Sequence, residues 1–340
     1  MKTLPQESST RPAFQSPKYR LPWLFKLLLS VLLLGWVLRS VELALFWKTI
    51  RSADMVLVAV AVILFFPAQL LAAYRWYFLL KKLELSQPFW SIVRYTILGQ
   101  LSALFLPGRI SGDVVRTIAI AHRQREKAPF ALSVIIDKTA LLIALSTFAL
   151  VGTFGSRVLS QFVTVYVAAV GLVLVALLVL VFLCRCRGNH IPDWVSRFGG
   201  QLPFAHRYVL NVSSLPRLSF HTIVMLLVLG FGLQLSYTIG SYVMARSMHI
   251  AISPMDWAAI SAFVALVQIL PVTIGGLGVR EGVLAGILGL YRVPVTQAVA
   301  YSLIGFAIVS CLILLSWLII ESVSMHKVWN VIEDERRVAR

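Results

Sequence analysis

The sequence predicts an all-α polytopic integral membrane protein, with about eight long transmembrane helices and two short broken or re-entrant helices in an inverted repeat. Apolar residues make up 59% of the 340 residues and charged residues 13%, against about 45–50% and about 25% in soluble domains. Long apolar segments recur along the chain, and a helix needs about 20 such residues to cross a bilayer. The composition therefore excludes a water-soluble globular protein and a disordered one.

One transmembrane domain, residues 21–325, is expected between a polar cytoplasmic tail at 1–20 and a second tail at 326–340. No small-x-small cleavage pattern follows the first apolar stretch, so we expect an uncleaved anchor. Each apolar segment is expected to form one helix, and these segments lie near residues 21–38, 55–80, 89–106, 129–152, 158–184, 218–245, 255–270 and 295–322.

Residues 107–122 and 271–290 differ from the other apolar segments because they carry Gly, Pro and Arg. This composition is typical of broken or re-entrant helices that line a cavity. An offset of 164 positions aligns the two segments, matching Leu106-Pro107 with Leu270-Pro271, Gly112 with Gly276, and Val115-Arg116 with Val279-Arg280. Each copy follows a short apolar segment and precedes a long one, so we expect a repeat with units at about 89–152 and 255–322.

The positive charges indicate how the chain is oriented, since cytoplasmic loops collect Lys and Arg. If residues 107–122 and 271–290 each cross the membrane, 18 Lys and Arg lie inside and 6 outside. If they dip in and leave on the same side, the numbers are 12 and 15. The crossing arrangement is therefore favoured. It implies that both termini are cytoplasmic and that the two repeats are inverted.

The net charge of +17 fits anionic lipid headgroups better than nucleic acid, because no nucleic-acid recognition motif accompanies it. The six His residues are scattered without metal-binding spacing, and three Cys residues do not make a disulfide framework. No serine elbow, zinc motif or P-loop is present. We therefore expect no nucleic-acid partner, no catalytic residue, no metal and no cofactor.

Charged residues at membrane depth are the candidates for function, because each costs about 2.5–3.5 kcal/mol on insertion scales unless it faces a cavity or a partner. They are Arg75, Asp113, Arg116, Asp137, Lys138, Arg280, Glu281 and Glu321. Two structural explanations compete with function: an internal ion pair between helices, or a long side chain that reaches the interface from a helix end. One or the other of these structural explanations is favoured for Arg75 and Glu321, which lie near the ends of their segments.

Arg116 and Arg280 occupy matching positions of the two repeats. We expect each to lie about one turn into a helix that starts after a Pro-Gly break. A guanidinium fork beside a helix N-terminus suits a phosphate or carboxylate. The predicted headgroup-binding residues are Arg116, Arg280, Gly112, Gly276 and Gly278, and the predicted counter-charges are Asp113, Asp137, Lys138 and Glu281. Gly278, Gly282 and Gly286 also favour close helix packing.

Four stretches together resemble the lysylphosphatidylglycerol synthase transmembrane-region family, whose members are flippase-like membrane proteins. They are Arg75-Trp76, the run from Leu106-Pro107 through Gly112-Asp113 to Arg116, Asp137-Lys138, and the run from Pro271 through Gly275-Gly276-x-Gly278-x-Arg280-Glu281-Gly282. The resemblance covers about residues 20–325. Ser111 stands where a second Gly is usual, and Lys138 where Arg is usual; the Lys keeps the charge but loses the bidentate fork.

The resemblance implies that the chain moves an anionic phospholipid or lipid-linked headgroup between leaflets. Bifunctional members carry a soluble aminoacyl-transfer domain, for which this chain leaves no room, so we expect no lysyl-lipid synthesis by the chain alone. A membrane-embedded transferase subunit acting on a lipid-linked sugar, or a small-solute transporter, are the alternatives. The expected partner is the lipid or lipid-linked substrate, and a partner synthase or glycosyltransferase and a homo-oligomer stay open.

The topology leads to a first prediction. Cys184 and Cys186 should lie on the cytoplasmic side, so a membrane-impermeant thiol reagent added to intact cells should leave them unlabelled in a Cys311→Ala background. Permeabilised cells are the positive control and should give full labelling. Rapid labelling from outside would overturn the orientation of both repeats.

Overall fold

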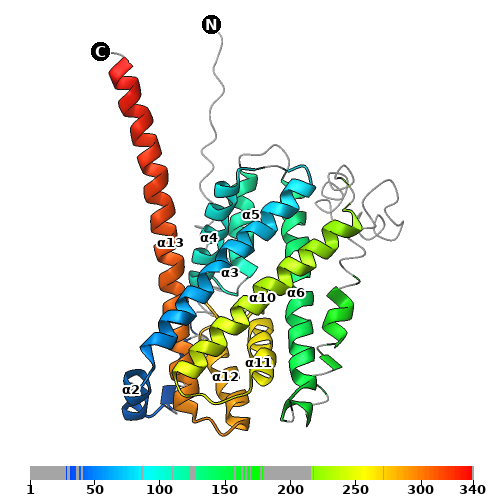
Figure 1. Ribbon diagram of the computed structural model, residues 1–340, viewed down its shortest axis with the longest axis vertical. Helices are drawn as coiled ribbons and strands as arrows, with labels where there is room; N and C mark the ends of the chain where they lie inside the picture. Colours follow the sequence, from blue (N-terminus) through cyan, green and yellow to red (C-terminus); the bar gives the residue numbers. More distant parts are fainter. Residues whose placement is uncertain are drawn as a thin grey trace.

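Figure 1 shows the computed structural model of the chain. It describes residues 28–338 except 29–30, 36–37, 40, 86, 109, 123–126, 157, 162–163, 165–166, 169, 177, 179–215, 217 and 271, with side chains as far as residue 322. Cys184, Cys186, Arg109 and Pro271 therefore lie outside the described residues, as do parts of the helices expected at 21–38 and 158–184.

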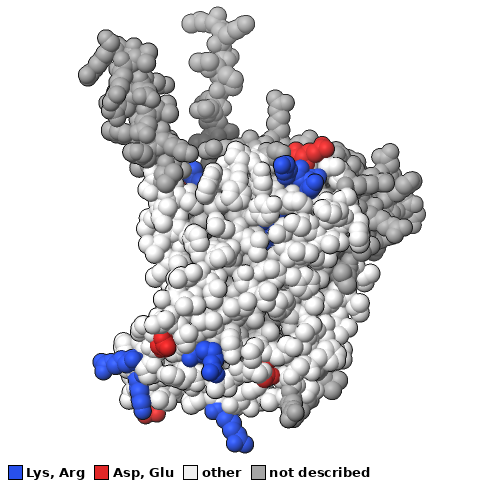
Figure 2. Space-filling model, viewed as in Figure 1, with Lys and Arg blue, Asp and Glu red and all other residues white. Residues whose placement is uncertain are grey.

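Long apolar helices dominate the described part of the chain and confirm a polytopic membrane protein. Among the described residues, four helices are long and apolar enough to cross a bilayer: α3 (Met55–Lys82), α6 (Ala128–Phe154), α10 (Phe220–Ser247) and the Val295–Ser322 part of α13 (Val295–Val338). A helix of 28 residues is about 42 Å long, more than the roughly 30 Å of hydrocarbon in a bilayer. Figure 2 shows charges gathered at the two ends of one face, with an almost uncharged band between them.

Two pairs of shorter helices form hairpins. The first pair is α4 (Phe89–Phe105) and α5 (Ile110–Ala121), and the second is α11 (Pro254–Val267) and α12 (Val279–Leu290). In the first hairpin the backbones touch, since a Cβ added to Gly112 would lie 2.1 Å from the carbonyl oxygen of Gly99. In the second, the hydroxyl of Tyr291 donates to Asp256 over 2.7 Å, joining the end of α12 to the start of α11.

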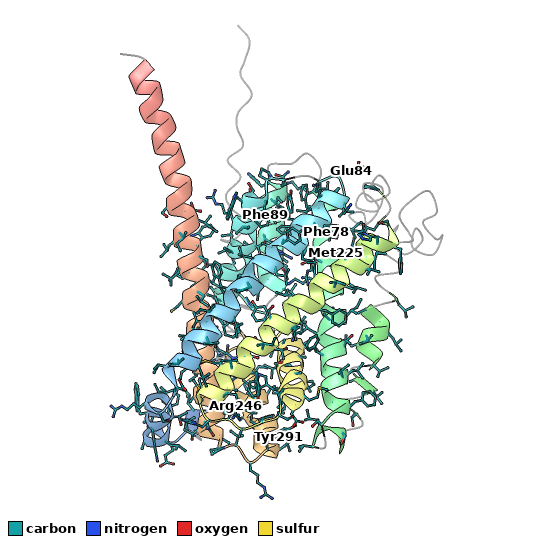
Figure 3. The ribbon with its side chains drawn as sticks, in the orientation of Figure 1. Phe78, Glu84, Phe89, Met225, Arg246 and Tyr291 are labelled. Carbon is teal, nitrogen blue, oxygen red and sulfur yellow. The ribbon has the colours of Figure 1, made fainter. Side chains whose placement is uncertain are left out.

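The hairpins enter from opposite ends of the molecule (Figure 1). Glu84 and Phe89 mark the end from which α4 starts, and Arg246 and Tyr291 mark the other end, where α12 finishes (Figure 3). Each hairpin therefore returns to the end from which it came. The short helix α2 (Leu43–Arg51) and the 3-10 turn at Leu159–Gln161 lie at the same end as Tyr291 (Figure 1).

This geometry corrects both arrangements considered from the sequence. Neither α5 nor α12 crosses the molecule; each forms half of a re-entrant hairpin with the apolar helix before it. The described loops nevertheless lie on the sides that the crossing arrangement gave them. The physical reason is that two full crossings and one half-deep hairpin both return the chain to its starting side, so a count of loop charges does not separate them.

The tips of the two hairpins meet in the middle of the protein. Pro107 and Ile274 form an isolated antiparallel bridge, and the amide of Gly108 donates to the carbonyl of Thr273 over 3.1 Å. Gly108 has φ +70°, a left-handed value that favours glycine. Non-helical backbone is tolerated at membrane depth only where protein groups or water satisfy it, and here each tip supplies partners for the other.

The same order of helices occurs twice, and each series begins one helix earlier than the segments aligned in the sequence. Helices α3 and α10 are both 28 residues long and begin at Met55 and Phe220, 165 positions apart. Each is followed by a hairpin and then a long helix, α6 or α13. The amide of Asp54 donates to the carbonyl of Ser247 over 2.9 Å, which places the start of α3 beside the end of α10. The two four-helix units therefore run in opposite directions, and α6 packs on α11 while α13 packs on α4.

The contact between α4 and α5 provides a stability test. Gly112→Ala would press a methyl group into the backbone of Gly99, and overpacking of this kind costs about 1–3 kcal/mol. The matched control is Gly286→Ala in α12, where an added Cβ meets nothing within 4 Å and should stabilise the helix by up to about 1 kcal/mol. Thermal unfolding of the purified protein in detergent should show midpoint shifts of opposite sign. Equal midpoints for both variants would contradict the close approach.

Candidate functional site

Five charged side chains form one network between α3, α5 and α6, here named the α5–α6 charge cluster: Arg75, Asp113, Arg116, Asp137 and Lys138. Arg75 Nε donates to Asp137 Oδ1 over 2.7 Å, and Arg116 Nη2 lies 3.0 Å from Asp137 Oδ2. The same Nη2 lies 3.1 Å from Asp113 Oδ1, and Lys138 Nζ lies 3.0 Å from Asp113 Oδ2. Every carboxylate oxygen in the cluster therefore faces a cation.

Burial in this cluster falls steadily toward one side. The side chains of Arg75 and Asp137 are each 2% exposed, whereas that of Lys138 is 36% exposed. The network thus leads from the protein interior to a partly open position on α6. Of the charges predicted to serve this site, the structure brings Asp113, Arg116, Asp137 and Lys138 together in one place.

An aromatic side chain fixes the orientation of Arg116. Its guanidinium lies 4.3 Å from the centroid of the Trp76 ring, a cation–π contact that is strong when both groups are desolvated. Trp76 Nε1 in turn donates to Ser133 Oγ over 3.1 Å, which ties the ring to α6. Arg116 is therefore held in place by packing as well as by charge.

For Arg75 the sequence favoured a structural explanation, either an internal ion pair or a helix-end position, and the structure shows the ion pair but also a contact that the sequence did not reveal. The structure buries Arg75 and pairs it with Asp137. Its direct neighbour Trp76 carries the stacking contact to Arg116. The signal that could have revealed both residues was that they adjoin each other within an otherwise apolar run, where an Arg is costly.

A second, smaller group surrounds the start of α12 and is here named the α12 cap cluster: Arg280, Glu281 and Ser302. Glu281 is fully buried. Its Oε2 accepts from the amide of Gly278 over 2.7 Å, and its Oε1 accepts from Arg280 Nε over 3.0 Å and from Ser302 Oγ over 2.8 Å. The arrangement is a capping interaction, in which a Glu at the third helical position satisfies the helix N-terminus.

The two arginines are not equivalent, although their motifs align. Arg116 is the seventh residue of α5, whereas Arg280 is the second residue of α12. The expectation of one turn into each helix is therefore wrong for both. The reason is the run Gly275-Gly276-x-Gly278, whose glycines all have positive φ and delay the start of α12. Within the described residues, Arg116 and Arg280 have separate partners.

The three predicted glycines have different surroundings. Gly112 lies against Gly99, and Gly278 approaches the helix at residues 31–35 so closely that an added Cβ would lie 2.6 Å from Leu33 Cβ. Gly276 is more open, since its nearest neighbour would be the Gln268 side chain at 3.4 Å. Contact of these glycines with a headgroup stays a prediction.

Glu321 belongs to neither cluster, because it pairs with Arg94 at a site where the two side chains are 29% and 45% exposed. An ion pair is one of the two structural explanations considered for Glu321 from the sequence. Among the residues that the structure describes, no group of three or more His, Cys, Asp or Glu is placed to hold a metal ion.

Comparison with known proteins gives one family. The family model described as lysylphosphatidylglycerol synthase TM region matches residues 23–316, which is most of the chain and includes both clusters. Searches of curated proteins and of solved structures give no match.

The burial gradient predicts unequal effects of removing two arginines. Arg75→Ala leaves Asp137 buried with one cation fewer and should lower the free energy of unfolding by about 3–5 kcal/mol. Arg94→Ala removes an exposed pair and should cost about 0–1 kcal/mol. Thermal unfolding of both purified variants in detergent measures the difference. Similar midpoints would show that the buried network contributes no more than a surface ion pair.

Proposed function

Because the chain belongs to the lysylphosphatidylglycerol synthase transmembrane-region family, we propose that it translocates an anionic phospholipid or lipid-linked headgroup across the bacterial inner membrane. The observation that carries the proposal is the α5–α6 charge cluster, in which three cations from three helices lie at membrane depth. Such charges are costly in hydrocarbon and mark substrate pathways in membrane proteins.

The two opposed hairpins support movement across the membrane rather than binding alone. Each hairpin carries a charge cluster toward the middle of the protein from its own end, and the tips touch at Gly108 and Thr273. Inverted repeats of this kind hold a substrate near the midplane while one unit rocks against the other. We propose that α3–α6 and α10–α13 form such an inverted repeat.

A headgroup would meet the two clusters in turn, because Arg116 and Arg280 hold separate partners. Asp113 and Asp137 neutralise Arg116 when the phosphate is absent, and Glu281 does the same for Arg280. Of the three predicted glycines, Gly276 is the one best placed for backbone approach to the headgroup, because its nearest neighbour is the flexible side chain of Gln268. The cytoplasmic side in this proposal is the end that carries Glu84, next to the basic residues Lys81 and Lys82.

Translocation can be tested with the purified protein in liposomes. Fluorescent phosphatidylglycerol in the inner leaflet should become accessible to a membrane-impermeant quencher. A transferase would need a second substrate to act, whereas translocation needs none, and a solute transporter would leave the lipid where it is. Protein-dependent quenching in the absence of any other substrate therefore supports the proposal, and quenching no faster than in protein-free liposomes would end it.

Substitutions of the two arginines test whether Arg116 and Arg280 bind the headgroup. A hydrogen bond to a charged group contributes about 1.5–3 kcal/mol, or roughly 10–150-fold in affinity, so Arg116→Lys and Arg280→Ala should each slow translocation by that order. Arg94→Ala is the control and should not change the rate. Arg280→Ala also leaves the buried Glu281 with one partner fewer, so Arg280→Ala with Glu281→Gln is needed. Full activity of that double variant would show that the two residues are only a structural ion pair.

A further inference from the structure

The α5–α6 charge cluster carries one positive charge more than its own carboxylates balance. It holds three cations, Arg75, Arg116 and Lys138, and two carboxylates, Asp113 and Asp137. The α12 cap cluster, by contrast, pairs one cation with one carboxylate and is neutral. Among the described residues no further carboxylate joins this cluster. Since an unbalanced charge at membrane depth is costly, an anionic ligand would compensate the surplus.

One hydrogen-bond donor of Arg116 lacks an acceptor among the described residues. Its Nε group is buried and has no hydrogen-bond partner there. A buried donor without a partner costs about 1–3 kcal/mol, and more when it is charged. This donor is an observation independent of the charge count, and it indicates that Arg116 has capacity for a further acceptor.

The partly open side of the cluster is surrounded by apolar side chains. Lys138 is the most exposed member of the network, and on its own helix Ile135 is exposed. On α5, Val114 directly follows Asp113, the partner of Lys138, and is exposed together with Ile118. A cation set in an exposed apolar surface suits an amphipathic ligand, whose acyl chains lie on the apolar side chains while its charged group reaches the Lys.

We infer that the α5–α6 charge cluster is the receptor for one singly charged phosphodiester group of a lipid, which arrives from the membrane between α5 and α6 past Lys138 and binds Lys138 and Arg116 beside Asp113. This inference rests on the proposed function, which it sharpens by giving the charge of the headgroup and the side of approach. Asp113 is the carboxylate nearer the point of approach because it is the more exposed of the two, at 11% against 2%. Asp137 stays in place between Arg75 and Arg116.

The inference also assigns different tasks to the two hairpins. In the α12 cap cluster the carboxylate of Glu281 already occupies the position that an anion would take at the helix N-terminus, with Gly278, Arg280 and Ser302 as its donors. That cluster is complete without a ligand, whereas the α5–α6 charge cluster is not. Initial binding of the lipid should therefore depend on the first cluster and not on the second.

Binding selectivity should follow the net charge of the cluster. The experiment measures equilibrium binding of three lipids to the full-length protein in detergent: phosphatidylglycerol, a singly charged phosphodiester; phosphatidic acid, a monoester that reaches two charges; and zwitterionic phosphatidylcholine. The protein should prefer phosphatidylglycerol. Asp113→Asn raises the cluster to +2 and should shift the preference to phosphatidic acid, and Lys138→Met lowers it to zero and should weaken phosphatidylglycerol binding by at least about tenfold.

The double variant Asp113→Asn with Lys138→Met is the matched control, because it returns the cluster to +1 and should restore the preference for phosphatidylglycerol. Neutralising the exposed pair Arg94–Glu321, which belongs to neither cluster, with Arg94→Gln and Glu321→Gln should leave binding unchanged. Water-soluble glycerophosphoglycerol should compete poorly, because it lacks the acyl chains. Equal competition by that compound, or a lipid preference that ignores the cluster charge, would overturn the inference.

If Asp113→Asn does not fold, Lys138→Met and Lys138→Arg carry the test, since Lys138 is partly exposed and only the first change alters the charge. The binding measurement and the translocation measurement test the two proposals independently. Charge-dependent binding without translocation in liposomes would refute the proposed function and keep the receptor. Translocation with a lipid preference independent of the cluster charge would refute the receptor and keep the function.

Discussion

The carboxylate of Asp137 is the interaction on which the first half of the protein depends. Its two oxygens accept from Arg75 of α3 and Arg116 of α5, so a single side chain of α6 joins three helices at membrane depth. In hydrocarbon no water competes for these groups, and breaking such a pair exposes an uncompensated charge. The position of α5, and with it the first hairpin, is thereby fixed relative to the long helices.

The two hairpins satisfy backbone hydrogen-bonding groups that a broken helix leaves without partners in a membrane. The residues at their tips cannot form helical hydrogen bonds, and lipid offers no substitute. Here the two tips bond to each other through Gly108, Thr273 and Leu106, so each break requires the other. A protein built from one hairpin alone would leave these groups without partners, and this explains why the two units come as a pair.

The two charge clusters differ in how their helices start and in their net charge. Helix α12 starts after a glycine-rich run and is capped by its own Glu281, whereas α5 starts soon after Pro107 and carries Arg116 two turns further along. One cluster is closed and neutral, and the other has surplus charge and a donor without an acceptor among the described residues. Similar patterns of Pro, Gly and Arg therefore give two different local arrangements of charge in this protein.

The membrane class, the position of most helices and the two broken segments followed from the sequence alone. Hydrocarbon imposes a length and an apolar composition on every spanning helix, so α3, α6, α10 and α13 lie within a few residues of the expected segments. Lys138 and the other intramembrane charges were recognisable for the same reason, since each must be compensated.

Only the tertiary structure decided how those charges combine and how deep the broken segments reach. The Lys and Arg in a loop indicate on which side of the membrane that loop lies, but not how the chain runs between two loops. A half-deep hairpin and two full crossings therefore give the same charge count on each side. The partner of Arg75 could not be predicted either, because Asp137 lies 62 positions away and is brought to it by the packing of α3 against α6. Ion pairs between distant helices depend on that packing, which no local pattern of residues encodes.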